Sequence, residues 1–488
     1  MLTLQKIFLK NPNSPAFWLV LGFIVKGALF LGVVFNHPYH DIAGIWGATW
    51  ADDDSYLVPI DNFLRHGIYT PDYRMPGYGI VYLLFRLVFA QAGACNALLI
   101  LQLILASASV YYLALIARNI FKSNAVFYLT FYLFLLCSFS DFFDAYIASE
   151  SLCTSLLIFN VYFFIRYFQE RKNKYLFFAG LLATWVMFIR PVFGGLVVVF
   201  SFLILFKKGV RLNNKVKFVL LFLIPFVLCE GSWVSRNFQV HKKITPFNST
   251  GNPFYPGEAA TYIEPLFNFV QSWGGLCSGT GKYNDMDWFQ YNQKDGPSII
   301  HYDSLPNNIY TSAFNKDSLL RLKVMILALQ KPSIDTTTAS IYQQELRTKF
   351  DKYRFSIERE KPFLYFIKAP LRMLHEMLYG YDAKLYLERG KSVPFFGGLI
   401  VAFNYFMYIT LLFFGLMGAV WLIIIGIKRS SLIIVIPFIP LYTILIHPFI
   451  FRFFASRYLM PAYPFLIICS AYLLYTIYKR CFSQKIKG

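Results

Sequence analysis

Long apolar segments alternate with short charged ones along most of the 488-residue chain. In lipid a backbone must satisfy its own hydrogen bonds, so apolar segments of this length are predicted to cross as helices. About 20 residues of helix are needed to span a hydrocarbon core of roughly 30 Å. We assign ten spans, at residues 17–35, 96–117, 125–137, 152–168, 175–189, 192–206, 218–233, 400–427, 432–450 and 459–478. The pattern predicts an all-α, polytopic transmembrane helical bundle.

The charged residues orient this bundle. Lys6 and Lys10 precede the first span and Lys479 and Arg480 follow the last, so the positive-inside rule predicts that both termini are cytoplasmic. The N-terminus lacks a small-residue cleavage site, so the first span is expected to remain as an anchor. The net charge of +20 lies at span ends and not on one soluble face, which argues against nucleic acid as a partner. We expect a multi-pass protein of a bacterial plasma (inner) membrane.

Two acidic loops fall on the exoplasmic side in this topology. The segment Tyr78 to Ala92 is too short to cross the bilayer and is interpreted as an interfacial or re-entrant helix. Residues 36–94 then form a first outer loop that bears juxtamembrane helices. A second outer loop carries Asp141, Asp144 and Glu150. If the segment from Tyr78 spanned instead, the two acidic loops would lie on opposite sides of the membrane.

The polar middle of the chain divides it into three regions. Residues 1–235 form an N-terminal transmembrane module, 236–394 an exoplasmic subdomain, and 395–488 a C-terminal transmembrane module. Within the subdomain, helical patterning is seen at 318–331 and 341–360. Apolar and charged residues then alternate from Phe363 to Leu378, which predicts an amphipathic helix lying in the membrane interface.

Three adjacent carboxylates, Asp52, Asp53 and Asp54, come soon after the first span. Mutual repulsion raises the pKa of one member of such a group, which suits a general base. The same acids together with Glu150 could share a divalent cation, Mg²⁺ or Mn²⁺, through oxygen ligands, so a metal cofactor stays open. The alternatives are a solvated helix cap for the triplet and a first-turn acid that complements the helix dipole for Glu150.

Several arginines lie on the outer side, against the topological bias. Arginine keeps its charge and binds phosphate through a planar, bidentate fork, so two or three of them would suit a lipid-phosphate pocket. Snorkelling to lipid head groups is the alternative for any single one. These arginines each adjoin aromatic or proline residues and are Arg74, Arg190, Arg236, Arg452 and Arg457.

The first outer loop contains a longer motif, DDDSYLVPIDNFLRHGIY followed by RMPGYG at residues 74–79. It resembles the first exoplasmic loop of the GT-C superfamily of integral membrane glycosyltransferases. The closest resemblance is to the branch of dolichyl-phosphate-mannose-protein mannosyltransferases and the lipid A aminoarabinose transferase. Matching the NFL at residues 62–64 with NLL of that branch puts Asp52 at its key acid and Tyr56 at its tyrosine.

Further short motifs follow in the order of that family. The family's R-x-P-G-Y-P corresponds to Arg74, Pro76, Gly77 and Tyr78, with Gly79 in place of the final proline. The segment from Ile263 to Thr338 has no counterpart. The remaining matching motifs are Ser149-Glu150, Arg190-Pro191, Arg236-Asn237, and Arg457-Tyr458 with Pro461 and Pro464.

The resemblance implies inverting transfer of a hexosyl or pentosyl group from a polyprenyl-phosphate donor on the exoplasmic face. The acceptor would be a hydroxyl or amine-bearing glycan, lipid or protein of the cell envelope. Asp52 would be the general base, with Asp53 as the second choice, and Asp53 and Glu150 would orient the acceptor or hold a metal. Residues for the donor phosphate and the substrate would be Tyr56, Arg74, Tyr78, Arg190, Arg236, Asn237, Arg457 and Tyr458.

Two other functions remain alternatives. A transporter of lipid-linked oligosaccharide would place ionisable residues in the middle of its spans. Here the spans are nearly free of charge, with Lys26 as the main exception. A polysaccharide polymerase or ligase would place paired arginines in outer loops without the acid cluster after the first span.

Overall fold

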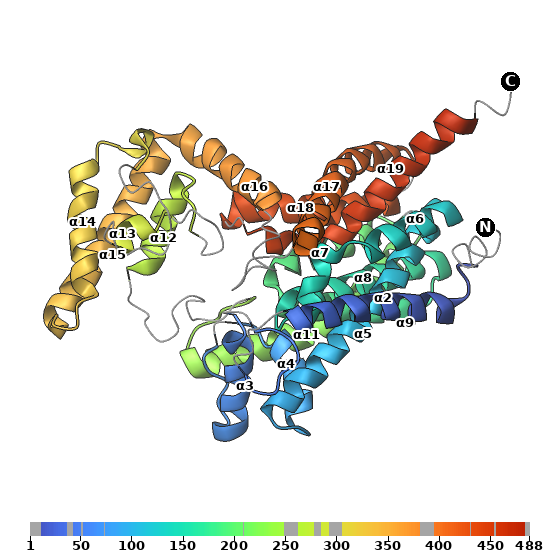
Figure 1. Cartoon of the computed structure of the whole chain (residues 1–488), viewed down its shortest axis with the longest axis horizontal. Helices are drawn as coiled ribbons and strands as arrows, with labels where there is room; N and C mark the ends of the chain where they lie inside the picture. Colours follow the sequence, from blue (N-terminus) through green and yellow to red (C-terminus); the bar gives the residue numbers. More distant parts are fainter. Residues whose placement is uncertain are drawn as a thin grey trace. The chain divides into compact units, whose positions relative to one another are not determined.

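The structure is a computed structural model that describes residues 11–36, 42–49, 52–72, 74–207, 209–247, 262–277, 285–291, 305–380, 395–429, 431–452 and 455–483. These residues form helices and two isolated β-bridges, with no β-strand among them (Figure 1). The all-α prediction is confirmed. The chain divides into two compact units, one of Met1–Gly251, Ala383–Thr443 and Met460–Gly488, the other of Asn252–Asp382 and Ile444–Leu459.

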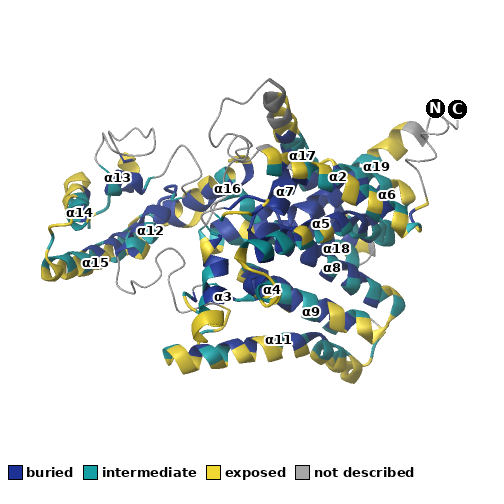
Figure 2. Ribbon diagram, turned by 60° about the horizontal axis from the view of Figure 1, so that its bottom comes forward, coloured by how far each residue is buried: buried dark blue, intermediate teal, exposed yellow. Residues whose placement is uncertain are grey.

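The first unit is a helical bundle built from apolar helices. Long α5 and α8 lie at its centre, and most of their residues are coloured as buried in Figure 2. Against α5 pack α2, α6 and α8, while α9 packs against α8 and α11. The helices of this unit are α2 Pro15–Asn36, α3 Asp54–His66, α4 Gly77–Arg86, α5 Gln91–Phe121, α6 Asn124–Leu135, α7 Ser138–Asp141, η1 Phe142–Ala145, α8 Ser149–Glu170, α9 Asn173–Ile189, η2 Pro191–Phe193, α10 Gly194–Leu205, α11 Leu212–His241, α17 Phe395–Arg429, most of α18 Ser431–Ile446, and α19 Tyr463–Ser483.

Small residues allow some of these helices to approach closely. Gly180 of α9 faces the backbone of Phe222 in α11, and a Cβ there would lie closer than 3.0 Å to it. Close backbone approach through small residues is how helices associate in lipid, where apolar side chains gain little by leaving hydrocarbon. The sequence pattern therefore sets which segments are helices, and small residues help to set which helices touch.

Helices occupy nearly all of the ten predicted spans. Among the described residues, six are long and apolar enough to cross a membrane: 15–35, 91–121, 149–170, 212–241, 402–428 and 432–451. A seventh is formed if α6 and residues 139–145, bent by 58°, count as one span. The helices α9 and α10 are shorter apolar helices. A polytopic bundle is therefore confirmed. Six or seven of the ten predicted segments are both long enough and apolar enough to cross a membrane.

Two short helices connect the first span to α5. The amphipathic helix α3 ends where Gly67 adopts the left-handed conformation, with φ of 70°. At 10 residues, α4 is about 15 Å long, too short for a bilayer, as the sequence indicated. Its neighbours are α3, α5 and α9. The loop before α3 is joined to the second acidic loop by a parallel bridge between Ala48 and Tyr146.

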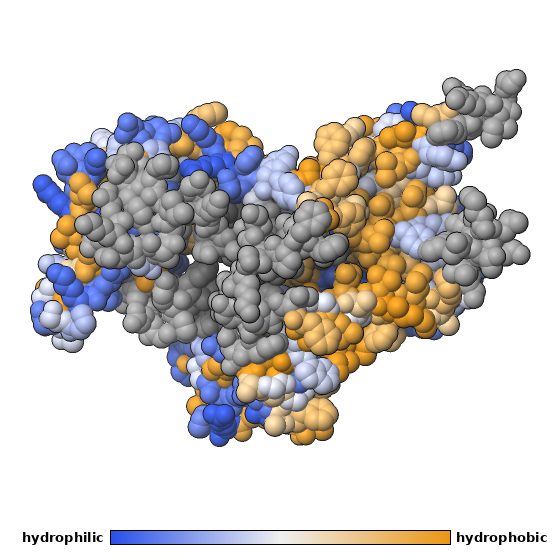
Figure 3. All heavy atoms as spheres, in the orientation of Figure 1, coloured by the Kyte–Doolittle hydropathy of each residue, from blue (hydrophilic) through white to orange (hydrophobic). Residues whose placement is uncertain are grey.

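The second unit has its own apolar core. Phe269, Phe314, Phe350 and Tyr353 are buried together, and the rings of Phe314 and Tyr353 stack at 4.6 Å. The two helices predicted at 318–331 and 341–360 correspond to α14 and to most of α15. Hydrophilic side chains gather on α14 and α15 in Figure 3, whereas apolar side chains cover much of the visible bundle. The elements are α12 Ile263–Ser272, α13 Asp287–Gln290, η3 Asn307–Ile309, α14 Lys316–Leu329, α15 Thr336–Glu360, the π-helix η4 Leu364–Lys368, α16 Ala369–Tyr379, the π-helix η5 His447–Phe451 and η6 Ser456–Leu459.

Candidate active site

Asp52, which the family resemblance matches to a key acid, pairs with the arginine of the RMPGYG motif. Arg74 Nη2 lies 3.0 Å from Asp52 Oδ1, and both side chains are about a quarter exposed. Arg74 Nη1 donates to the Tyr56 hydroxyl at 2.9 Å, and the guanidinium lies 4.5 Å from the centre of the Tyr56 ring. The loop after α3 therefore folds back so that one arginine holds both the acid and the tyrosine.

Tyr56 is the buried centre of a group of charged residues. Burial raises the pKa of its phenol, as do the charges of Glu150 and Asp52, while Arg74 and Arg190 lower it. The net effect is a raised pKa, so the hydroxyl stays protonated at neutral pH. Two acids and two arginines from separate parts of the chain thus act on a single phenol.

The acid of the Ser149-Glu150 motif is paired with the arginine of the Arg190-Pro191 motif. Arg190 Nη2 lies 2.5 Å from Glu150 Oε1, and Arg190 Nε donates to Ser149 Oγ at 3.0 Å. Both charged side chains are almost fully buried, with 9% of Arg190 and 2% of Glu150 exposed. The N-terminus of α8 and the C-terminus of α9 are joined by this pair, which needs both partners because a lone buried charge is costly.

The three adjacent aspartates occupy three different environments. Asp52 is partly exposed, Asp53 is 7% exposed, and Asp54 is exposed in the first turn of α3. The carbonyl of Asp53 accepts from the amides of Tyr56 and Leu57 at 2.9 and 3.0 Å and so begins the helix. Within the described ranges, no three acidic, histidine or cysteine side chains are grouped closely enough to hold a metal ion.

A second charged cluster lies where the loop after α3 meets the end of α11. Arg236 pairs with Asp72 and also donates to the carbonyl of Tyr69 at 2.7 Å. His241 Nε2 lies 2.5 Å from Asp72 Oδ2. Asn237, the residue after Arg236, is buried and donates to the carbonyl of Thr245 at 3.2 Å. This hydrogen bond joins the end of α11 to the loop that follows it.

Asp72 predicts a pH dependence of stability. Burial alone raises its pKa, but the hydrogen bonds from Arg236 and His241 outweigh burial and leave the pKa below 3.8. A carboxyl whose pKa is lowered by folding stabilises the protein fully above its unfolded pKa, and this contribution is lost as pH falls through the folded value. Wild type should therefore unfold at a higher temperature than Asp72→Asn above about pH 3.8. Thermal unfolding from pH 3 to pH 7 checks this, and a gap between the two proteins that widens as pH falls would contradict it.

Tyr78, the tyrosine of the RMPGYG motif, packs against Tyr56. The rings of Tyr78 and Tyr56 lie 4.7 Å apart, and the Tyr78 hydroxyl donates to Gln102 Oε1 at 2.8 Å. Gln102 Nε2 in turn donates to the carbonyls of Asp144 and Tyr146 at 3.2 and 2.9 Å. Tyr78 therefore links α4 to the second acidic loop through α5.

Gly77, at the start of α4, is required by close packing. A Cβ at this position would lie closer than 3.0 Å to the backbone of Phe188 and Ile189 at the end of α9. Gly77→Ala should displace α4 and cost about 1–3 kcal/mol through overpacking. Gly27→Ala is the matched control, because a Cβ at Gly27 has no heavy atom within 4 Å. Thermal unfolding of the two variants in detergent compares them, and equal midpoints would contradict the packing argument.

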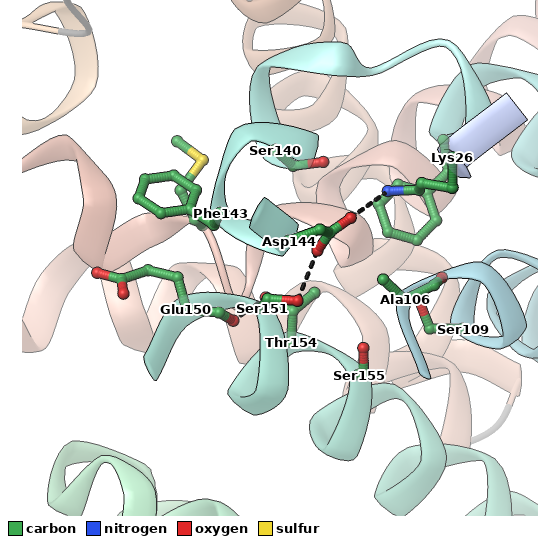
Figure 4. Close-up of a pocket in the computed structure, with 12 residues that line it drawn as sticks. Lys26, Ala106, Ser109, Ser140, Phe143, Asp144, Glu150, Ser151, Thr154 and Ser155 are labelled. Atoms are coloured by element: carbon green, nitrogen blue, oxygen red, sulfur yellow. Dashed lines mark hydrogen bonds and ion pairs between the residues drawn. The ribbon is translucent and has the colours of Figure 1, made fainter. Parts of the chain in front are cut away.

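A buried ion cluster that the sequence did not predict lies beside the start of α8. Lys26 of α2 pairs with Asp141, and its Nζ lies 3.3 Å from Asp144 Oδ2. Ser151 Oγ donates to the same Asp144 carboxylate at 2.5 Å. Figure 4 shows Asp144 between Lys26 and Ser151, with the Glu150 carboxylate directed away from this pair. The sequence showed the lysine in the first span and the two aspartates of the second acidic loop separately, and nothing in their spacing indicated that they pair.

The last two predicted site residues belong to the second unit. The Arg457 guanidinium lies 5.5 Å from the ring of Tyr458, which stacks on His447 at 5.2 Å. The other predicted residues, from Asp52 to Asn237, belong to the first unit. There the structure joins the separate motifs into an acid–arginine cluster around Tyr56 and a neighbouring one around Asp72.

Residues 76–233 match a family model described as dolichyl-phosphate-mannose-protein mannosyltransferase. The match covers about a third of the chain. It includes Tyr78, Glu150 and Arg190, while Asp52 precedes it and Arg236 follows it. No curated protein matches the chain. The matched segment supports a membrane glycosyltransferase of the GT-C type.

Proposed function

We propose that the protein transfers a sugar from a polyprenyl-phosphate donor to an acceptor hydroxyl or amine on the exoplasmic face of the membrane, with inversion. The observation that supports this most strongly is that Arg74 pairs with Asp52 and also contacts buried Tyr56. An accessible carboxylate and a cation suited to phosphate lie side by side there, next to the segment that matches the mannosyltransferase family.

The reaction needs one base and stabilisation of a phosphate leaving group. Asp52 accepts the proton of the acceptor hydroxyl while that oxygen forms a bond to the anomeric carbon of the donor. The bond from the anomeric carbon to the lipid-phosphate oxygen breaks on the opposite side, and the phosphate keeps the electron pair. This leaving group needs charge stabilisation and not protonation, so the second carboxylate of a glycosidase is not required.

The three aspartates are suited to different roles in this mechanism. A base must reach the acceptor, and the side chain of Asp52 is 26% exposed and contacts Arg74. Asp53 is buried and begins α3, which suits positioning of the loop, although it remains the second choice for the base. Asp54 is exposed in the first turn of α3 and is given no role.

Arginines of the site would bind the donor phosphate by exchanging partners. Arg74 holds Asp52 and Arg236 holds Asp72 in the structure described here. A phosphate that draws Arg74 away from Asp52 leaves this carboxylate free to accept the acceptor proton. Glu150 and Arg190 pair with each other and are almost fully buried. This burial favours a role in orienting the site over a role in proton transfer. Arg457, in the second unit, stays a sequence-based prediction for the phosphate.

A divalent cation at Asp52, Asp53 and Glu150 would have to compete with arginine for two of its ligands. Arg74 lies 3.0 Å from the carboxylate of Asp52, and Arg190 lies 2.5 Å from that of Glu150. The proposed base and leaving-group chemistry is supplied by the carboxylate and the arginines themselves.

A lipid-linked oligosaccharide transporter is the second candidate function. The observation that favours it is the buried Lys26 in the first span, paired with Asp141 and Asp144. Intramembrane charges of this kind mark substrate or ion pathways in many transporters. All three side chains are buried, and Ser151 also donates a hydrogen bond to Asp144. These contacts instead favour an ion cluster with a structural role.

Transfer of label from a panel of radiolabelled polyprenyl-phosphate sugars tests the proposed function. Bacterial inner membranes that contain the protein are compared with membranes that lack it, with glycan, lipid and protein fractions analysed separately. We expect one donor to label one acceptor fraction only when the protein is present, with an inverted anomeric bond in the product. No transfer from any donor, together with movement of donor between the leaflets of proteoliposomes, would replace the transferase by the transporter.

A further inference from the structure

The end of the second unit's long helix leads into a segment with two different faces. Along η4 and α16, Leu364, Tyr365, Ala369, Met373 and Met377 are buried against their own unit. The residues of the other face are large and apolar, yet exposed within the described structure. They are Phe363, Phe366, Ile367 and Leu371, with exposed fractions of 70%, 52%, 43% and 49%.

The segment that bears this exposed face packs against the end of a candidate membrane span. The span 432–451 ends in the π-helix η5, and α16 packs against both η5 and η6. Arg452, the first residue after the span, donates from Nη2 to the carbonyl of Tyr365 at 2.9 Å. Its guanidinium also lies 3.7 Å from the centre of the Tyr365 ring. Arg452 therefore holds residues 364–368 close to the end of the candidate span, where the chain is expected to leave the hydrocarbon.

Cations accompany the apolar face. Lys368 and Arg372 are exposed one helical turn apart, and His375 follows within the next turn. Arg372 Nη2 lies 4.0 Å from Asp285 Oδ2, and 44% of the Arg372 side chain is exposed. Glu376 lies 3.7 Å from His375. An apolar face flanked by lysine and arginine is typical of helices that lie in the interface of an anionic bilayer.

We propose that residues 363–375 form an in-plane membrane anchor that binds anionic lipid head groups. Phe363, Phe366, Ile367 and Leu371 enter the boundary between head groups and acyl chains, while Lys368 and Arg372 contact lipid phosphates. The continuity with the span end through Arg452 favours lipid over a protein partner as the occupant of this face. The anchor holds the second unit at the membrane surface, where a polyprenyl-phosphate substrate would also reside.

A fluorescent label on the full-length protein in lipid nanodiscs tests this proposal. Cys229, Cys277 and Cys481 are first replaced by serine, which leaves the four buried cysteines. Phe366→Cys is then labelled with an environment-sensitive dye. Gln344→Cys, exposed on the polar helix α15, is the matched control. Elution as a single species confirms that each variant is folded.

In nanodiscs containing phosphatidylglycerol, the label at position 366 should be blue-shifted and quenched by spin-labelled lipid, and the label at 344 should not. Lys368→Glu combined with Arg372→Glu should lower the inserted fraction by about fivefold for each cation. Nanodiscs of phosphatidylcholine alone should lower it as well. Equal water exposure at both positions would overturn the proposal. So would a blue-shifted label at 366 that lipid does not quench, because protein would then cover the face.

Discussion

Asp52→Asn should abolish most sugar transfer, with kcat falling by about 10²–10⁴-fold, the usual contribution of a general base. The asparagine keeps the size of the side chain and a partner for Arg74, but it cannot accept a proton. Donor binding should change little, so the loss should be seen in kcat rather than in KM. The measurement is label transfer in membranes with the variant and the wild type at equal abundance.

Asp54→Asn is the control that makes this result specific. It removes the same charge two residues away, from an exposed position in the first turn of α3, and should transfer sugar at close to the wild-type rate. Asp53→Asn tests the second choice for the base. If only Asp53→Asn loses transfer, the base is reassigned to Asp53. Full transfer by both Asp52→Asn and Asp53→Asn would refute the proposed mechanism.

Lys26→Met should strongly destabilise the bundle. The methionine fills a similar volume but leaves Asp141 and Asp144 buried, with 3% and 6% of their side chains exposed, and without their cation. Removing one partner of a buried ion pair costs about 3–5 kcal/mol, because the remaining charge has no counter-ion. The thermal unfolding midpoint in detergent should fall accordingly.

The double variant Lys26→Met with Asp141→Asn separates charge from packing. It also removes one of the two uncompensated carboxylates, so it should recover part of the lost stability despite carrying a second substitution. If the double variant is less stable than Lys26→Met by the full cost of Asp141→Asn alone, the two residues act independently. The ion pair would then contribute little to folding.

The positions of the helices followed largely from the apolar pattern. The predicted span at 17–35 is α2, and the break predicted between the spans 175–189 and 192–206 falls at Arg190-Pro191, between α9 and η2. Proline has no amide hydrogen and favours the start of a helix, so this turn is visible in the sequence. Fewer helices than the ten predicted spans are long enough to cross, because the 12 residues of α6 and the 17 of α9 are short for a bilayer.

The pairing of charges was not visible in the sequence. The family motifs placed Glu150 and Arg190 in the candidate site separately, and nothing in their spacing showed that they form a buried pair. Asp72 and His241 received no role, yet they complete the cluster around Arg236. Such contacts depend on which helix faces meet, and a linear pattern does not contain this information.

The sequence by itself determined the class of protein and the helical segments, and it named the acids and arginines of the candidate site. These are local properties, since the length and hydropathy of a segment decide whether it can satisfy its backbone in lipid. Only the tertiary structure decided that Arg74 holds Asp52, that Arg190 holds Glu150, and that Lys26 meets Asp141 from a position 115 residues away. Burying a charge is costly without a partner, and that partner is fixed by packing between distant helices.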